Sequence, residues 1–106
     1  MDLRISDLLA MQTELQQLHP EWGGTPPSRG RDQLMWGIGE IGEVIDIIKK
    51  NGAETACSDE TLRRDLIEEL ADVLMYYNDV LLCYGITEEE LKKSYTEKFK
   101  RNINRW

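Results

Sequence analysis

Two pairs of carboxylates, each with its members three residues apart, are the side chains of this sequence best suited to chemistry. Glu40 and Glu43 lie in the segment GEIGEVIDIIKKNG, and Glu69 and Asp72 lie in EELADVLMYYND. An ionised carboxylate among apolar residues is costly unless a counter-charge accompanies it, and two facing pairs also repel. A divalent cation supplies that counter-charge, and oxygen ligands without histidine or cysteine favour Mg²⁺ or Mn²⁺. Such pairs also occur on ordinary solvated helices, so the spacing alone leaves both interpretations open.

The residues that other chemistries need are missing or isolated. His19, the single histidine, lies beside a proline, which disfavours a di-iron bundle with Glu-x-x-His motifs and a nucleophile activated by histidine. Cys57 and Cys83 match neither a metal-ligand spacing nor a disulfide framework. Cys83, in the apolar segment DVLLCYG, is expected to be a reduced thiol in the core. The sequence also has no glycine loop of the P-loop type.

Four helices and no strands are expected to position these residues. Apolar spacing, Pro20 and the glycines at 52 and 85 mark their ends, and Thr87 with Glu90 forms a capping box. The expected helices cover about residues 5–18, 32–51, 59–84 and 88–104. Residues 19–31, rich in proline and glycine, and residues 52–60 are expected to be loops.

Helical periodicity assigns faces to the second and third predicted helices. On the second, an apolar stripe faces the core, made of Leu34, Ile38, Ile41, Ile45 and Ile48. The opposite stripe carries the first acidic pair between an aromatic and an aliphatic residue, as Trp36, Glu40, Glu43 and Ile47. On the third helix the predicted core stripe is Leu62, Leu66, Val73, Tyr77, Val80 and Tyr84. Glu69 falls at the edge of that stripe, with Asp72 beside it.

Composition narrows the classes of partner. The 106 residues include 13 basic and 20 acidic side chains, a net charge of −7 that argues against binding to polymeric nucleic acid. A phosphate ligand is therefore expected to arrive with a cation. No apolar run is long enough to span a membrane, and the first twenty residues do not read as a signal peptide, so we expect a cytoplasmic protein. A chain of this length forms one small domain, residues 1–106, with a modest core, and self-association is expected.

Several segments of the sequence resemble those of a known protein family. The motifs EIGE and ELAD, with twenty-five residues between them, are similar to the ExxE…ExxD pattern of the MazG-like all-α nucleoside triphosphate pyrophosphohydrolases. The segments LLAMQTELQ and LMWGIGEIGEVIDIIKKNG and the basic ending YTEKFKRNINRW also resemble such proteins. Many relatives have a further glutamate before the first pair, where this chain has Gly39, which puts any role of that position in doubt.

The resemblance implies an all-α, four-helix, bundle-like protomer that forms a homodimer or homotetramer. It implies Mg²⁺-dependent hydrolysis of a nucleoside triphosphate to the monophosphate and pyrophosphate, in a role such as housecleaning of the nucleotide pool. Glu40, Glu43, Glu69 and Asp72 would hold the metal. The alternatives are a phosphoribosyl-ATP pyrophosphohydrolase of the same superfamily and a non-catalytic helical module that binds metal or a partner.

Further residues are candidates for contacts with the substrate. Either Glu40 or Glu43 could take the proton of the attacking water. On the last predicted helix, Lys98, Asn102 and Arg105 share a face and are candidates for binding the phosphates, although cations there also suit the helix dipole. The candidates for stacking on the base are Trp22, Trp36 and Tyr76. Taken singly, an aromatic residue of this kind is more often a core residue than a platform for a base.

Overall fold

The computed structural model describes residues 2–105, and within them the fold is all-α. Five α-helices and two 3₁₀ turns follow one another along the chain, and no strand occurs in this part of it. In order they are α1 (Ile5–Leu18), η1 (Pro20–Trp22), η2 (Pro27–Arg29), α2 (Gly30–Asn51), α3 (Ala53–Ser58), α4 (Glu60–Cys83) and α5 (Glu88–Ile103). The expected all-α class is therefore confirmed.

Two of the predicted loops contain helical structure. Residues 53–58, expected to be part of a loop, form α3, because Ala53, Glu54 and Ala56 favour a helix once Gly52, with a φ of 84°, has turned the chain. The fold thus has five α-helices instead of four. The proline-rich segment after α1 contains η1 and η2, and in each a proline occupies the first turn, where its missing N–H group costs no hydrogen bond.

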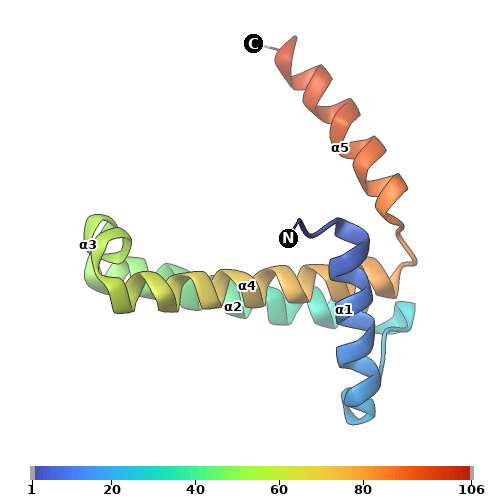
Figure 1. Cartoon of the computed structure of the whole chain (residues 1–106), viewed down its shortest axis with the longest axis horizontal. Helices are drawn as coiled ribbons and strands as arrows, with labels where there is room; N and C mark the ends of the chain where they lie inside the picture. The colour runs from blue at the N-terminus through green and yellow to red at the C-terminus, as the bar shows by residue number, and fades with distance from the viewer. Residues whose placement is uncertain (1, 106) are drawn as a thin grey trace.

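The long helices α2 and α4 lie side by side and run in opposite directions, with α3 joining them at one end (Figure 1). Helix α1 packs across the other end of α4, and α5 projects away from the pair (Figure 1). The start of α4 is fixed by Asp59, whose carboxylate accepts a hydrogen bond from the Leu62 N–H at 3.0 Å. The predicted capping box of Thr87 and Glu90 is confirmed at the start of α5.

Close packing at one point sets how α2 meets α4. Gly30, the first residue of α2, is buried against the ring of Tyr84, which follows the last turn of α4. A Cβ atom at position 30 would overlap that ring. The approach of an aromatic side chain, and not an unusual φ, therefore favours glycine at this position.

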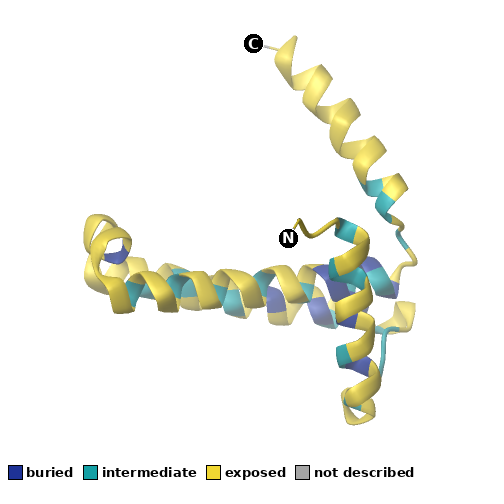
Figure 2. Cartoon of the chain, in the orientation of Figure 1, coloured by how far each residue is buried: buried dark blue, intermediate teal, exposed yellow. Residues whose placement is uncertain are grey.

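The apolar core of the protomer is very small. In the described part of the chain the buried apolar residues are Ala56, Leu81 and Cys83, and Cys83 is a free thiol as predicted. The stripe expected to face the core on α2 is instead exposed in the protomer, as are the aromatic rings expected in the core on α4. The exposed members are Leu34, Ile38, Ile41, Ile45, Ile48, Tyr77 and Tyr84. Figure 2 shows exposed residues along most of α2, α4 and α5.

The overall dimensions agree with an incomplete core. The chain exposes 8180 Å², whereas a folded monomer of this length exposes about 6,100 Å². Its radius of gyration is 16.2 Å, against about 13 Å for a compact domain of 106 residues. The periodicity therefore identified an apolar face correctly, but that face is not covered by the chain's own helices.

Candidate functional site

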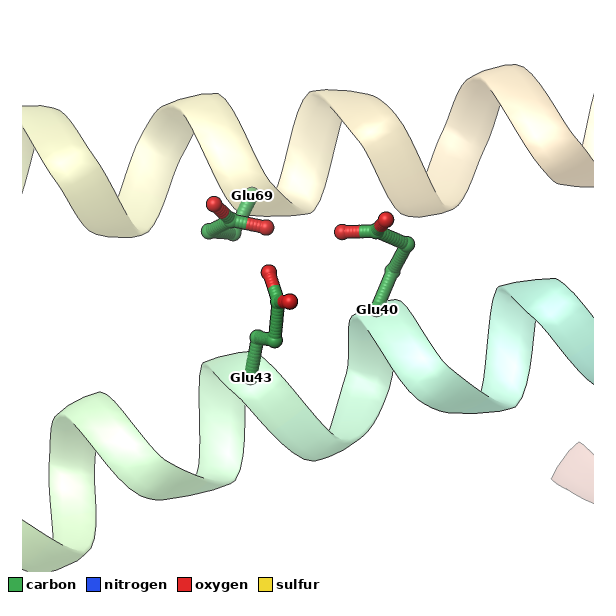
Figure 3. Close-up of side chains that lie close together, drawn as sticks. All are labelled: Glu40, Glu43 and Glu69. Atoms are coloured by element: carbon green, nitrogen blue, oxygen red, sulfur yellow. The ribbon is translucent and has the colours of Figure 1, made fainter.

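Three carboxylates from two helices meet between α2 and α4. Glu40 and Glu43 lie one turn apart on α2 and point toward Glu69 on α4 (Figure 3). One carboxylate oxygen from each residue lies within 4.8 Å of the other two. The i, i+3 spacing places the first two side chains on one face of α2, and the packing of α4 beside that face supplies the third. We call these three residues the carboxylate cluster.

Asp72, the fourth predicted ligand, does not belong to the carboxylate cluster. It lies one turn after Glu69 on α4, is exposed, and lines the cavity that adjoins the cluster. The four predicted ligands thus lie in one region between the helices. Three of them have carboxylate oxygens within 4.8 Å of one another, and Asp72 lies on the side of the cavity.

The electrostatics of the cluster favour a counter-charge. The pKa of Glu69 is raised to about 7. The largest cause is hydrogen bonding with Glu40, the second is hydrogen bonding with Glu43, and the third is desolvation by burial. One carboxylate oxygen of Glu69, Oε2, is buried and accepts no hydrogen bond from any described residue. Close to neutral pH the cluster therefore either retains a proton or takes up a cation. Its donors are carboxylate oxygens only, a set that fits Mg²⁺ or Mn²⁺ and does not fit a metal that prefers nitrogen or sulfur.

A cavity of about 640 Å³ adjoins the cluster and brings together the three aromatic residues considered as base-binding candidates. Its wall includes Trp22 from the loop after α1, Trp36 from α2 and Tyr76 from α4, together with Asp72. The volume is within the range of small-molecule sites. Burial raises the pKa of the Tyr76 hydroxyl, and the negative charges of Glu40 and Asp72 raise it further. Tyr76 is therefore neutral and can donate a hydrogen bond.

Arg29 stabilises the loop after α1, which forms one side of this cavity. Its guanidinium donates hydrogen bonds to the backbone carbonyls of Trp22 and Gly24 and lies 5.4 Å from the centroid of the Trp36 ring. The ring of His19 stacks on the ring of Trp22, with their centroids 4.1 Å apart. These contacts fix two of the aromatic rings at the cavity although one of them belongs to an irregular segment.

The cavity also contains buried polar residues that sequence analysis missed. Gln12, Gln16, Gln33 and Asp79 are each at least nine-tenths buried and line its wall. The side-chain amide of Gln16 donates to Asp79 Oδ1 at 3.1 Å. Burial raises the pKa of Asp79, while the Gln16 and Gln12 amides act in the opposite direction. Two glutamines four residues apart among the leucines of α1 were the available signal.

The remaining candidates lie elsewhere in the protomer. Lys98, Asn102 and Arg105 line a separate hollow at the C-terminal end of the chain, together with Arg101. Because α5 projects away from α2 and α4 (Figure 1), these basic residues do not adjoin the carboxylate cluster of their own chain.

A family model described as the MazG nucleotide pyrophosphohydrolase domain matches residues 31–105. This chain belongs to the MazG family. The match contains both acidic pairs and α5, and it begins after α1 and the loop that carries Trp22. No curated protein and no solved structure gave a match. Family membership suggests nucleotide pyrophosphohydrolase activity and a nucleotide substrate, and enzymes of the family generally depend on a divalent metal.

A helix that spans a membrane must be both long and apolar. Among the described residues of this MazG protein, no helix combines the length and the hydropathy that a membrane span requires.

The raised pKa of Glu69 makes a prediction about stability. Between about pH 4.5 and 7 the folded protein in EDTA keeps a proton on Glu69 that the unfolded chain releases. This contribution to the free energy of unfolding is complete below about pH 4.5 and is lost as the pH rises through about 7. The melting temperature in EDTA should therefore fall across this range, and Mg²⁺ should raise it more at pH 8 than at pH 5.5.

Circular dichroism melts with and without Mg²⁺, at constant ionic strength, provide the measurement. The Glu69→Gln variant is the control, because it cannot titrate at this position and should show a shallower dependence on pH. An Mg²⁺ effect equal to that of added sodium chloride would indicate simple screening and would contradict the prediction.

Proposed function

We propose that this protein hydrolyses a nucleoside triphosphate to the monophosphate and pyrophosphate with a divalent cation. The observation that carries the proposal is the position of the carboxylate cluster beside a cavity walled by aromatic rings. Carboxylates can hold a metal and its triphosphate, while the rings can stack on a base without strict dependence on its identity. The family supports the same reaction class. Cytoplasmic housecleaning of the nucleotide pool is the setting that we propose for it.

In this proposal Glu40, Glu43 and Glu69 hold Mg²⁺, for which Mn²⁺ can substitute, and Asp72 completes the set from the cavity side. A divalent cation held by these carboxylates would supply Lewis-acid chemistry, lowering the pKa of a bound water molecule and offsetting negative charge on the phosphates. Either Glu40 or Glu43 takes the proton of the attacking water, since each lies on the same face of α2. Trp22, Trp36 and Tyr76 hold the base in the cavity, with Arg29 keeping Trp22 in place.

Self-association is part of the proposal, because the protomer leaves the apolar faces of α2, α4 and α5 uncovered. A homodimer or homotetramer would bury those faces. It would also allow α5 of one copy to approach the carboxylate cluster of another, which its own α5 does not adjoin. We assign Lys98 and Arg105 to the outer phosphates of the substrate and Asn102 to a hydrogen bond with them.

The test of the function is pyrophosphate release from a panel of ribonucleoside and deoxyribonucleoside triphosphates, with Mg²⁺ and with EDTA. Release of one pyrophosphate for each monophosphate, in Mg²⁺ only, is the expected result. Phosphoribosyl-ATP is included in the panel, and its exclusive use would assign the chain to that alternative activity. Absence of turnover of every member, by a protein that nevertheless binds Mg²⁺, would identify a non-catalytic module and overturn the proposal.

The assignment of the α5 cations gives a separate prediction. Lys98→Ala should lower kcat/KM by about ten- to a hundred-fold, because the charged hydrogen bond to the leaving pyrophosphate strengthens as the bond breaks. The matched control is Lys100→Ala, on the same helix but outside the hollow. If Lys98 only interacts with the helix dipole, its replacement should cost less than about 1 kcal/mol of stability and leave kcat/KM unchanged. Melting and turnover measured on the same samples distinguish the two results.

A further inference from the structure

Two carboxamide oxygens in the cavity wall lack hydrogen-bond partners. Gln16 is 8 % exposed and Gln33 is 3 % exposed, and both line the cavity. The Oε1 atom of each is buried and accepts no hydrogen bond from any described residue. A buried amide oxygen without a donor is unfavourable, so most such atoms in folded proteins are paired. A ligand in the cavity can supply the missing donors.

The orientation of the Gln16 amide is determined by its neighbour. A carboxylate only accepts hydrogen bonds, and the Gln16 Nε2 group donates to Asp79 Oδ1 at 3.1 Å. The amide nitrogen must therefore face Asp79, which leaves Oε1 as the end that remains unpaired. The Gln12 amide also interacts with Asp79 and so strengthens this arrangement.

The rest of the cavity wall is also rich in hydrogen-bond acceptors. Asp72, Asp79 and Glu21 contribute carboxylates to it. The strongest donor in the wall, the guanidinium of Arg29, already donates to the carbonyls of Trp22 and Gly24. The Tyr76 hydroxyl is a donor in the same wall, but the carboxamide oxygens and the carboxylates are acceptors. A ligand N–H group therefore fits beside Gln16 and Gln33, whereas a carbonyl oxygen placed there would face acceptors.

Nucleobases differ in this property. Cytosine and adenine carry an exocyclic amino group with two N–H donors, whereas uracil, thymine and hypoxanthine carry a carbonyl oxygen at the corresponding position. We infer that the cavity selects nucleotides whose base carries an exocyclic amino group, through the carboxamide oxygens of Gln16 and Gln33. This inference rests on the proposed function for the triphosphate part of the ligand. Gln16 lies outside the span that the family model matches, so the selection depends in part on a segment beyond it.

The test compares pairs of substrates that differ at one position of the base. Deoxycytidine triphosphate is compared with deoxyuridine triphosphate, and adenosine triphosphate with inosine triphosphate. In each pair kcat/KM for the amino compound should be at least about tenfold higher, because the oxo compound leaves buried acceptors unpaired. Equal values within both pairs, or a preference for the oxo compounds, would overturn the inference and leave the proposed function intact.

Variants assign the selection to the carboxamides. Gln33→Met retains the length of the side chain and removes its acceptor, so the ratio within each pair should fall toward one. Gln17→Met is the matched control, because this exposed glutamine lies on α1 outside the cavity and its replacement should leave the ratio unchanged. A folded Gln33→Met protein with the ratio of the original chain would overturn the assignment.

A binding experiment separates failure of the inference from failure of the proposed function. Cytidine and uridine are titrated without metal, with quenching of tryptophan fluorescence as the signal, since Trp22 and Trp36 line the cavity. If no triphosphate is hydrolysed, the proposed function fails, and this experiment alone decides the base selectivity. Tighter binding of cytidine would support the inference, and equal binding or no binding of both nucleosides would overturn it.

Discussion

Replacement of Glu69 by glutamine should lower kcat/KM by at least about 1,000-fold while the helical content is retained. Glu69 is the single member of the carboxylate cluster that α4 contributes, so its loss leaves Asp72, outside the cluster, as the remaining proposed ligand from α4. The substitution also removes a negative charge from a group of three, which by itself favours folding. Loss of activity therefore cannot be attributed to unfolding, and circular dichroism on the same sample checks this.

The control is Asp46→Asn, which removes one exposed carboxylate from α2 outside the cluster and should leave kcat/KM within about twofold. Asp72→Asn tests the fourth ligand separately, and we expect it to abolish turnover as well. Glu43→Gln should behave like Glu69→Gln. If Glu43→Gln and Asp72→Asn both keep the rate of the original chain in Mg²⁺, the assignment of these carboxylates to a metal is wrong.

Ile38→Glu should dissociate the protein and strongly lower its stability. Ile38 is 66 % exposed in the protomer, so a glutamate there would be harmless in a monomer. In an assembly that buries the apolar face of α2, the same glutamate would be an unpaired charge in an apolar interface, which is strongly destabilising. Analytical ultracentrifugation over a range of concentrations, together with thermal melts, measures both effects.

The matched control for added charge is Gln17→Glu, at an exposed polar position on α1. It should leave mass and melting temperature unchanged. A chain that sediments as a monomer before substitution, and melts at the same temperature with Ile38→Glu, would contradict self-association through this face. Because Ala56, Leu81 and Cys83 are the only buried apolar residues between positions 2 and 105, we also expect the stability to rise with protein concentration.

Local signals in the sequence predicted where the long helices begin and end. They did not predict which helix faces are buried within the protomer. The ends marked by Thr87 and by the glycines after α2 and α4 are confirmed to within about two residues. The stripe of Ile38, Ile41 and Ile45 was assigned to the core, yet in the protomer it is exposed. Periodicity identifies a face that must be covered but carries no information about whether the same chain or another copy covers it.

Part of the candidate site could likewise be predicted from local spacing, and part depends on the tertiary structure. The i, i+3 spacing of Glu40 and Glu43 placed them on one face, but their meeting with Glu69 depends on the register between α2 and α4. Gln33 and Asp79 gave no local signal, since a single amide or carboxylate in a helix resembles a solvated residue until the tertiary structure buries it. α3 was missed because its glycine and polar neighbours resemble those of a loop.

The contact of Gly30 with the Tyr84 ring has a consequence for how sequences of this kind can diverge. A side chain at position 30 fits if the Tyr84 ring moves aside, if residue 84 becomes smaller, or if α2 slides along α4. A slide would carry Glu40 and Glu43 past Glu69 and break up the cluster. Positions 30 and 84 should therefore covary among related chains, with glycine opposite an aromatic ring or a larger residue opposite a small one. The alignment of the carboxylates is thus inherited together with a steric pair that takes no part in binding a metal.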